Sequence, residues 1–263
     1  MPIPCKICQA PTSLAFTAKV LNRYDALYYQ CPACGFLFAN DPHWLAESYK
    51  QPITSSDTGI LTRNLHCVRI MGALLKLCFA PSGIFADYGG GYGIFVRMMR
   101  DKGFNFYRDD KYCTNLFANG FDTAESNNDR FDLITAFELF EHWISPAHEL
   151  EYLFQKTDTV IFTTELLPTP LPRPDTWWYY GFEHGQHISF YMPLALEKLA
   201  AQFGLTYYHA GGFHLFTRCK PLLLKFRFYL ATNPYFALLG ELLLRRKSLA
   251  NTDFNQLTGN TIT

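Results

Sequence analysis

The stretch Ile84–Val96 limits what this chain can fold into more than any other part of it. Its apolar start, residues 84–86, predicts a buried strand that ends at the acid Asp87. Helical spacing of apolar residues returns over 92–102. Between the two lie four glycines within five positions: Gly89, Gly90, Gly91 and Gly93. In α/β proteins, a strand, a glycine turn and a helix in this order bring the backbone close to a nucleotide-like ligand.

Strand and helix patterns alternate along the middle of the chain, as expected for a parallel sheet crossed by helices. Seven segments have strand patterns: 84–86, 104–108, 121–123, 131–137, 159–164, 205–210 and 213–218. Helices are expected over 43–50, from a cap at Ser55, Ser56 or Asp57 to Leu77, over 92–102, around 112–118, from Pro146 to Phe154, and over 193–203. The sequence therefore predicts an α/β fold, a Rossmann-like, seven-stranded, mostly parallel sheet with helices on both faces.

Two C-x-x-C pairs near the N-terminus predict a structural Zn²⁺ site. Its ligands would be Cys5, Cys8, Cys31 and Cys34, because four thiolates complete the tetrahedral coordination that zinc adopts. Residues 19–30 read as a β-ribbon, so a small zinc ribbon is expected ahead of the main sheet. A redox pair and chance cysteines are the weaker alternatives. Since the ribbon has few basic residues, a structural or substrate-lid role is favoured over nucleic-acid binding.

Composition narrows the class of protein further. With 263 residues, 49% of them hydrophobic, the chain suits one α/β domain plus a small addition and is too apolar for global disorder. Lys plus Arg and Asp plus Glu both number 23, so no basic field favours nucleic acid as a partner. The N-terminus lacks a basic region followed by an apolar run, and half of the eight cysteines form C-x-x-C pairs. A cytoplasmic location is therefore expected.

Four regions are expected along the chain. They are a zinc-ribbon-like domain at 1–40, a helical connector with the first helix of the main domain at 41–83, a Rossmann-like domain at 84–218 and a C-terminal helical extension at 219–263. In the extension, charges and Asn233-Pro234 exclude a clean membrane span. Two short amphipathic helices over 222–244, ending in Arg245-Arg-Lys247, are expected instead. They would cap the core or form a homodimer face, with peripheral membrane contact less favoured.

The pattern Asp87-x-Gly89-x-Gly91-x-Gly93 differs from the dinucleotide fingerprint. G-x-G-x-x-G fails in both registers, because its third position falls on Ile94 or Val96. The pattern instead resembles the class I S-adenosylmethionine-dependent methyltransferases, in their small-molecule branch.

This resemblance covers residues 60–218. It includes the segment at 131–142, which reads Phe-Asp-Leu-Ile-Thr-Ala-Phe-Glu-Leu-Phe-Glu-His, and the later Gln-His-Ile-Ser-Phe-Tyr at 186–191. The four-cysteine ribbon is similar to that of zinc-bearing sugar C-methyltransferases and related enzymes. The resemblance implies the fold, the methyl-transfer activity and the cofactor of that family.

S-adenosylmethionine is thus the implied cofactor. In the family the glycine turn passes under its methionine part, and the acid that closes the second strand, here Asp110, holds both ribose hydroxyls. A carboxylate suits a vicinal diol, since its two oxygens can accept both protons. Asp122 or Glu125 would contact the adenine. The implied cofactor-binding residues are Asp87, Tyr88, Gly89, Gly90, Gly91, Gly93, Asp110, Phe137, Glu138 and Leu139.

The proline- and aromatic-rich segment 165–192 breaks the strand–helix rhythm, and long loops inside compact domains are usually functional. Its Trp177 and Trp178 fit a loop core as well as a substrate wall. The catalytic candidates are His184, His187 and Tyr191, which can take a proton or polarise a hydroxyl. A structural hydrogen bond is the favoured alternative for His187.

The leading hypothesis is methyl transfer to a small-molecule acceptor, by O- or C-methylation of a sugar or secondary metabolite. A catalytic base is needed only where the acceptor must lose a proton. Two alternatives stay open. One is a zinc-ribbon and Rossmann binding protein without catalysis, and the other, less favoured, is a nicotinamide-dependent enzyme.

Overall fold

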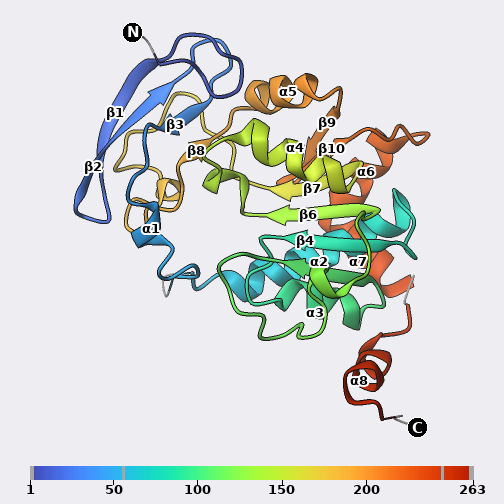
Figure 1. Cartoon of the computed structure of the whole chain (residues 1–263). Helices are drawn as coiled ribbons and strands as arrows, with labels where there is room; N and C mark the ends of the chain where they lie inside the picture. The colour runs from blue at the N-terminus through green and yellow to red at the C-terminus, as the bar shows by residue number, and fades with distance from the viewer. Residues whose placement is uncertain (1–2, 55–56, 244–245, 261–263) are drawn as a thin grey trace.

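The main sheet carries the central part of the chain in the computed structural model, which describes residues 3–54, 57–243 and 246–260. Its strands are β4 (Ile84–Tyr88), β5 (Asn105–Asp109), β6 (Leu133–Phe137), β7 (Thr159–Thr163), β9 (Thr206–Ala210) and β10 (Phe213–Thr217). They lie in the order β5-β4-β6-β7-β10-β9 (Figure 1). The first four are parallel, and β10 is antiparallel to both of its neighbours. The predicted α/β fold with a mostly parallel sheet is confirmed.

The predicted number of strands was wrong, because the described residues place six strands in this sheet. The expected seventh, at 121–123, is reduced to an isolated bridge between Arg108 and Asp122. Asp122 instead forms a capping box with Glu125, which starts the short 3₁₀ helix η1 (Thr123–Glu125). The chain therefore turns away from the sheet after a single bridging residue.

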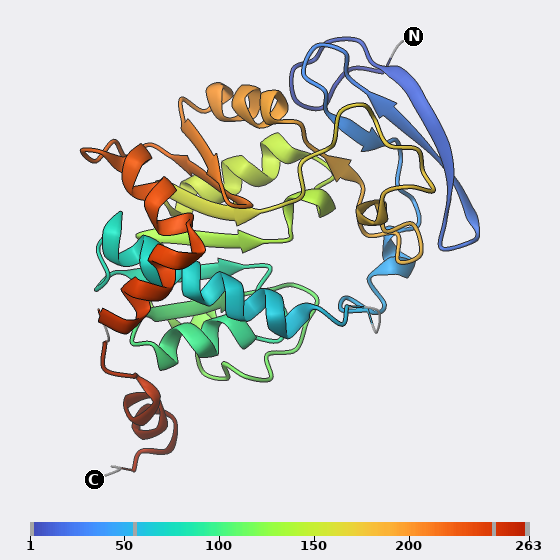
Figure 2. The same ribbon diagram turned by 180° about the vertical axis from the view of Figure 1, so that it is seen from behind.

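Helices cover both faces of the sheet, as predicted. One face carries α2 (Ile60–Leu77), α3 (Ile94–Asp101), α6 (Leu224–Thr232) and α7 (Pro234–Leu243), and the other carries α4 (Pro146–Lys156) and α5 (Pro193–Gln202) (Figure 2). Neighbouring strand residues point to opposite layers: Phe85 packs in the α2 layer and Ala86 in the α4 layer. Burial on both sides explains why these strands are continuous apolar runs.

A helix was expected around 112–118, and this was wrong. The described backbone there consists of bends and irregular residues, and a turn follows at 119–120. Side chains hold the backbone groups that a helix would pair, since Asp110 Oδ1 accepts the N–H groups of Tyr112 and Cys113. Asn115 likewise donates to the carbonyl of Ala118 and accepts its N–H. Such local side-chain bonds compete with helix formation.

The second sheet joins the N-terminal region to the segment 165–192. Its strands, in spatial order, are β1 (Ser13–Val20), β2 (Tyr24–Gln30), β3 (Leu37–Ala39) and β8 (Ser189–Phe190). β8 pairs with β3 through Ser189–Phe38 and Phe190–Leu37. A shared hydrophobic cluster includes Tyr28 from β2, Trp44 and Tyr180. The short helices α1 (Leu45–Ser48) and η3 (Trp178–Tyr180) flank this cluster.

The C-terminal region packs on the main sheet's α2 layer. The two expected helices are present as α6 and α7, and Phe228 and Ala237 are buried against that layer. A further helix that the sequence reading missed, α8 (Ala250–Thr258), follows. Its Asp253 is buried and accepts two hydrogen bonds from Arg100 of α3, at 2.9 and 2.7 Å. Arg245, Ser55 and Ser56 lie outside the described residues.

Among the helices that the structure describes, none is both long and apolar enough to span a membrane.

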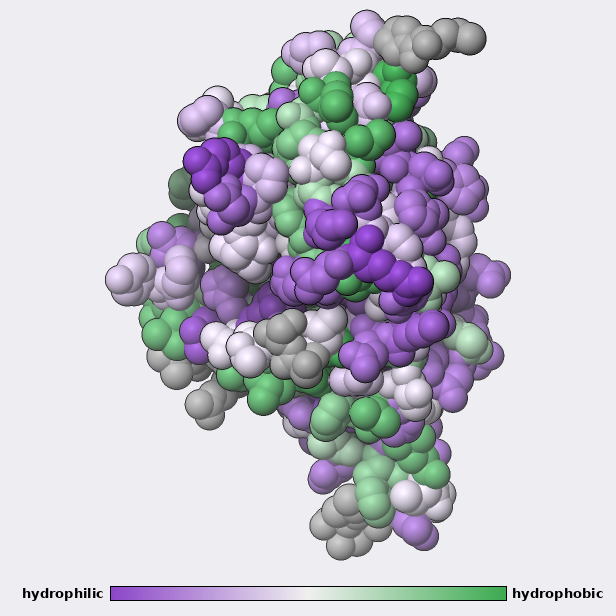
Figure 3. Space-filling model, turned by 90° about the vertical axis from the view of Figure 1, so that its left-hand side faces the viewer, coloured by the Kyte–Doolittle hydropathy of each residue, from purple (hydrophilic) through white to green (hydrophobic). Residues whose placement is uncertain are grey.

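Figure 3 looks onto the end of the molecule that carries β1 and β2. Hydrophilic side chains gather across the middle of that face, with hydrophobic ones above and below.

The Arg100–Asp253 pair gives a test of how the C-terminal region is held. Replacing Asp253 by Ala leaves a buried guanidinium without its carboxylate, and breaking such a pair costs about 3–5 kcal/mol. We expect D253A to lower the free energy of unfolding, measured by urea denaturation, by that order. The matched control is D101A, which removes the half-exposed partner of Arg97 on the same helix and should cost about 1 kcal/mol or less. Equal effects of the two variants would contradict this account.

Candidate active site

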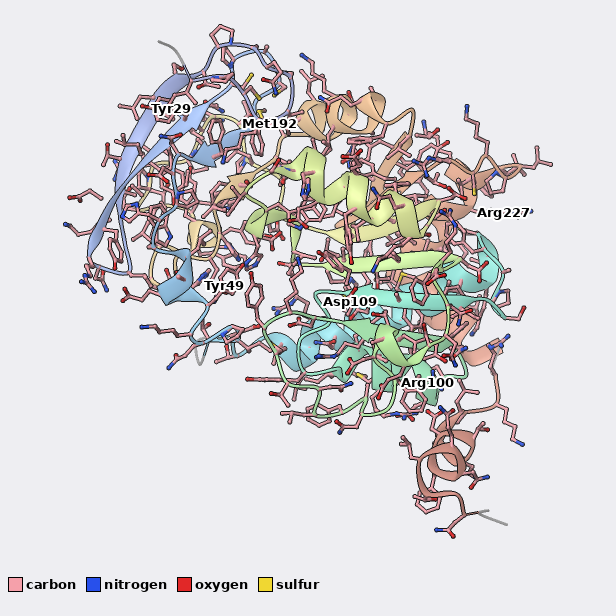
Figure 4. The ribbon with its side chains drawn as sticks, viewed as in Figure 1. Tyr29, Tyr49, Arg100, Asp109, Met192 and Arg227 are labelled. Atoms are coloured by element: carbon pink, nitrogen blue, oxygen red, sulfur yellow. The ribbon has the colours of Figure 1, made fainter. Side chains whose placement is uncertain are left out.

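A cavity of about 790 Å³ opens at the carboxyl ends of β4, β5 and β6. The strand order changes direction here, because β5 and β6 lie on opposite sides of β4, which is where open α/β sheets bind ligands. The size lies within the usual range for small-molecule sites. Tyr49, after α1, and Asp109, at the end of β5, both line it (Figure 4).

The glycine turn forms one wall and tolerates no side chain at its centre. Gly89 and Gly91 have φ of 75° and 54°, which L-residues rarely adopt. A Cβ on Gly90 would lie 2.8 Å from Cγ of Arg108 and 2.9 Å from Oδ2 of Asp87. A Cβ on Gly89 would meet Leu139. The turn therefore needs glycine both for its backbone and for its close packing.

Asp87 is buried beneath this turn, and its carboxylate faces the cavity wall. The Thr135 hydroxyl donates to Oδ1 at 2.6 Å. Burial raises the pKa of Asp87 to about 7, against the hydrogen bond from Thr135, which lowers it. Asp87 thus lines the cavity with a carboxyl group that stays protonated up to about pH 7 unless a positive charge binds next to it.

Asp110 ties the glycine turn to the loop after β5. Its Oδ2 accepts the N–H of Gly91 at 2.9 Å, while Oδ1 accepts the N–H groups of Tyr112 and Cys113. The Tyr112 ring in turn stacks on Tyr49, with centroids 4.4 Å apart. The carboxylate therefore already has three donors and keeps limited capacity for a further one.

Glu138 directly follows β6 and has a left-handed conformation, with φ of 48°. Its N–H donates to Thr163 Oγ1, and the Thr163 hydroxyl donates back to Glu138 Oε1 at 2.7 Å. Burial raises the pKa of Glu138. A non-glycine residue at positive φ is a strained arrangement that structures keep mainly at functional positions.

Three histidine rings from two different segments come together at the cavity. The ring of His187 lies 5.0 Å from that of His142 and 4.7 Å from that of His184, measured between centroids. Nδ1 of His187 lies 2.6 Å from the carbonyl of Tyr179. Burial lowers the pKa of all three, to about 3 for His187, so the rings are neutral near pH 7.

The structure brings most of the sequence-predicted residues together. Those that line the cavity are Asp87, Tyr88, Gly89, Gly90, Gly91, Asp110, Phe137, Glu138, Leu139, His184 and His187. Gly93 and Tyr191 do not, and the Tyr191 hydroxyl is buried and donates to the carbonyl of Phe140. Asp122 and Glu125 also lie off the cavity wall. The two tryptophans separate: Trp177 packs in the second sheet's cluster, while Trp178 is 76% exposed at the cavity.

Several lining residues were missed by the sequence reading. Tyr49, Asp57 and Arg63 come from the region expected to be a connector. Arg63 donates to both oxygens of Asp57, at 3.1 and 2.7 Å. The sequence offered no signal for them, because their place depends on how α1 and α2 pack across the sheet.

The four-cysteine cluster lies at the far end of the second sheet. Its sulfur atoms lie within 4.8 Å of one another, with Cys5–Cys34 at 3.6 Å and Cys8–Cys31 at 3.4 Å. Tetrahedral Zn²⁺ with bonds of about 2.3 Å requires sulfur atoms about 3.8 Å apart, so the thiols fit the metal. Four protein ligands close the coordination shell, which makes the site structural.

The fold and the site thus define the class of this protein. It is an α/β protein with a glycine turn after Asp87 and a cavity where the strand order of its sheet changes direction. A family model described as "Methyltransferase domain" matches residues 65–210, more than half of the chain. The chain belongs to this methyltransferase family. The match confirms the resemblance to S-adenosylmethionine-dependent methyltransferases and identifies the chain as an enzyme of that class. No curated protein matches the chain.

Solved structures with similar folds are distant. One of the plantazolicin methyltransferase, in complex with SAH, has a TM-score of 0.49 and 13% identity, covering 75% of this chain and 89% of that one. One of human N-acetylserotonin methyltransferase with SAM has a TM-score of 0.42 and 13% identity, with 68% and 66% covered. A third, magnesium protoporphyrin IX methyltransferase from Synechocystis PCC 6803 with SAH, has a TM-score of 0.40 and 10% identity. It covers 65% of this chain and 92% of that one.

The raised pKa of Asp87 predicts how stability depends on pH. The folded state keeps this proton up to about pH 7, whereas the unfolded chain releases it near 3.8. The free energy of unfolding should therefore fall as pH rises from about 4 to 7, by up to about 1.4 kcal/mol per unit from this group. In D87N the free energy of unfolding should fall less between pH 4 and 7 than in the wild type, by the contribution of Asp87. Urea denaturation at several pH values in this range measures the difference. D25N, at an exposed carboxylate, should leave the decline unchanged. A decline in D87N equal to that of wild type would refute the assignment.

Proposed function

We propose that this enzyme binds S-adenosylmethionine against the Asp87–Gly91 turn and transfers its methyl group to a small-molecule acceptor. The observation that supports this most is the content of a single cavity. The glycine turn, Asp110 and Glu138 line it together with His142, His184, His187 and Trp178. A donor and an acceptor could therefore meet within one cavity.

The cofactor's charges suit the groups on its side of the cavity. The buried carboxyl group of Asp87 would gain from the positive charge of the methionine ammonium or the sulfonium, which favours its ionised form. Glu138 supplies a second carboxyl group close by. Asp110 would accept a ribose hydroxyl with the remaining capacity of Oδ2, while it keeps the Gly91 N–H.

The acceptor would lie against the wall formed by the segment 165–192. Methyl transfer is an in-line displacement, so the protein mainly aligns the nucleophile and excludes water. His187 carries its proton on Nδ1 toward the Tyr179 carbonyl, which leaves Nε2 free to accept one. His184 lies beside it. A hydroxyl or a carbon acid, as in a sugar or a secondary metabolite, would lose its proton to Nε2 of His187. Nδ1 of His184 accepts the N–H of Gln186, so its neutral ring carries the proton on Nε2 and would donate instead.

Replacing Gly90 by Ala tests the donor side. The added Cβ would strike Asp87 and Arg108, and overpacking of this kind costs about 1–3 kcal/mol. We expect G90A to bind S-adenosylhomocysteine about tenfold more weakly or worse, measured by calorimetry. The control is G240A on α7, where a Cβ would meet nothing within 4 Å, and its affinity should equal that of wild type.

Titration of the wild-type protein with NAD serves as the comparison. If the wild type binds NAD and not S-adenosylhomocysteine at millimolar concentration, the proposal fails. Labelled methyl transfer to a panel of sugar and phenolic acceptors then identifies the acceptor class.

A further inference from the structure

A second cluster of metal-ligating groups lies beside the cavity, away from the four cysteines. It joins the 3₁₀ turn η2 (Phe140–His142), after β6, to the segment before β8. One ligand atom each from Glu141, His142 and His187 lies within 4.8 Å of the other two. We propose that these three residues bind a divalent transition-metal ion of the Zn²⁺ type at the acceptor end of the cavity.

The hydrogen bonds of the two histidines use Nδ1 of each ring and leave Nε2 available to bind a metal ion. Nδ1 of His187 lies 2.6 Å from the Tyr179 carbonyl, which can only accept, so this nitrogen bears the proton and Nε2 keeps its lone pair. Nδ1 of His142 lies 3.0 Å from the Tyr49 hydroxyl, which can accept in the same way. Metal-binding histidines typically use their second nitrogen for such a bond to an oxygen.

The carboxylate of Glu141 supplies an independent observation. The residue is 0% exposed, yet Oε2 has no hydrogen-bond partner among the described residues. Oε1 accepts from the Tyr179 hydroxyl at 2.7 Å. Leaving a buried carboxylate oxygen unpaired is costly, and a bound cation would compensate it. Tyr179 would thus orient two ligands at once, Glu141 through its hydroxyl and His187 through its carbonyl.

The donor set determines which ion fits. Two imidazoles and one carboxylate suit Zn²⁺ and its first-row neighbours, whereas Mg²⁺ and Ca²⁺ prefer oxygen ligands only. Three protein ligands leave a coordination position open, unlike the four-cysteine cluster. His142 and His187 both line the cavity, so an oxygen of the acceptor could occupy that position. This last consequence rests on the proposed methyl transfer, but the metal site itself does not. With the ion bound, Nε2 of His187 would be a ligand instead of a base, and the ion would favour loss of the proton from an acceptor hydroxyl.

Cobalt binding without cofactor or acceptor tests the site. The probe is Co²⁺ added to the whole protein with zinc kept in the four-cysteine cluster, and metals are counted per chain by elemental analysis. We expect one zinc and one cobalt per chain in the wild type, with visible cobalt bands and no sulfur-to-cobalt charge-transfer band. Cobalt absent from the wild type, or bound only with the sulfur band, overturns the proposal regardless of any variant.

Variants then assign the ligands. E141Q and H187A should each lose the bound cobalt while they keep the zinc, and Y179F should weaken cobalt binding about tenfold or more. The matched control is H148A, at an exposed histidine on α4, which should bind cobalt as wild type does. Cobalt binding unchanged in folded E141Q and H187A would also refute the site. Because S-adenosylhomocysteine binding is measured separately, failure of the metal site and failure of the proposed function are distinguishable.

Discussion

The pairing of β8 with β3 is the contact on which the shape of the active site depends. Ser189 and Phe190 of β8 pair with Phe38 and Leu37 of β3 and join the second sheet to the segment that carries His184 and His187. The indole N–H of Trp44 adds a hydrogen bond to the carbonyl of Gly185, at 2.8 Å. The main sheet and its glycine turn supply one wall of the cavity, as in an ordinary α/β domain. The other wall exists because the N-terminal strands hold the segment 165–192 in place above the carboxyl ends of β4 and β6.

The four-cysteine cluster contributes to this arrangement from a distance. The knuckle around Gly35 packs against Met192, just after β8, so closely that a Cβ on Gly35 would overlap its sulfur atom. Lys198 on α5 donates to the carbonyl of Ala33 in the same knuckle at 2.8 Å. A metal that orders the knuckle would therefore also hold the C-terminal end of the segment that lines the cavity. Such an effect would be the structural role that the sequence predicts for the ribbon.

Local sequence patterns predicted most of the fold and most residues of the candidate site. The strand before Asp87, the glycine turn and the cysteine pairs are recognisable because few residues, close in sequence, impose each of them. The reading failed where side chains override the backbone pattern, as when Asp110 and Asn115 replace the helix expected at 112–118. It could not find the place of Tyr49 at the cavity or the burial of Glu141 within the segment 131–142, since both arise from packing between distant segments. The strand at 121–123 failed for a similar reason, because Asp122 forms a capping box with Glu125 and starts η1.

The C-terminal helices bear on how the enzyme can be dissected. A shortened chain that ended at residue 218, just past β10, would keep every strand that the structure describes. It would nevertheless expose the apolar face of α2 that Phe228 and Ala237 cover, and it would leave Arg100 buried without Asp253. The last strand thus ends at Thr217, but the residues that complete the core continue to α8. The shortest fragment that folds should therefore extend through α8.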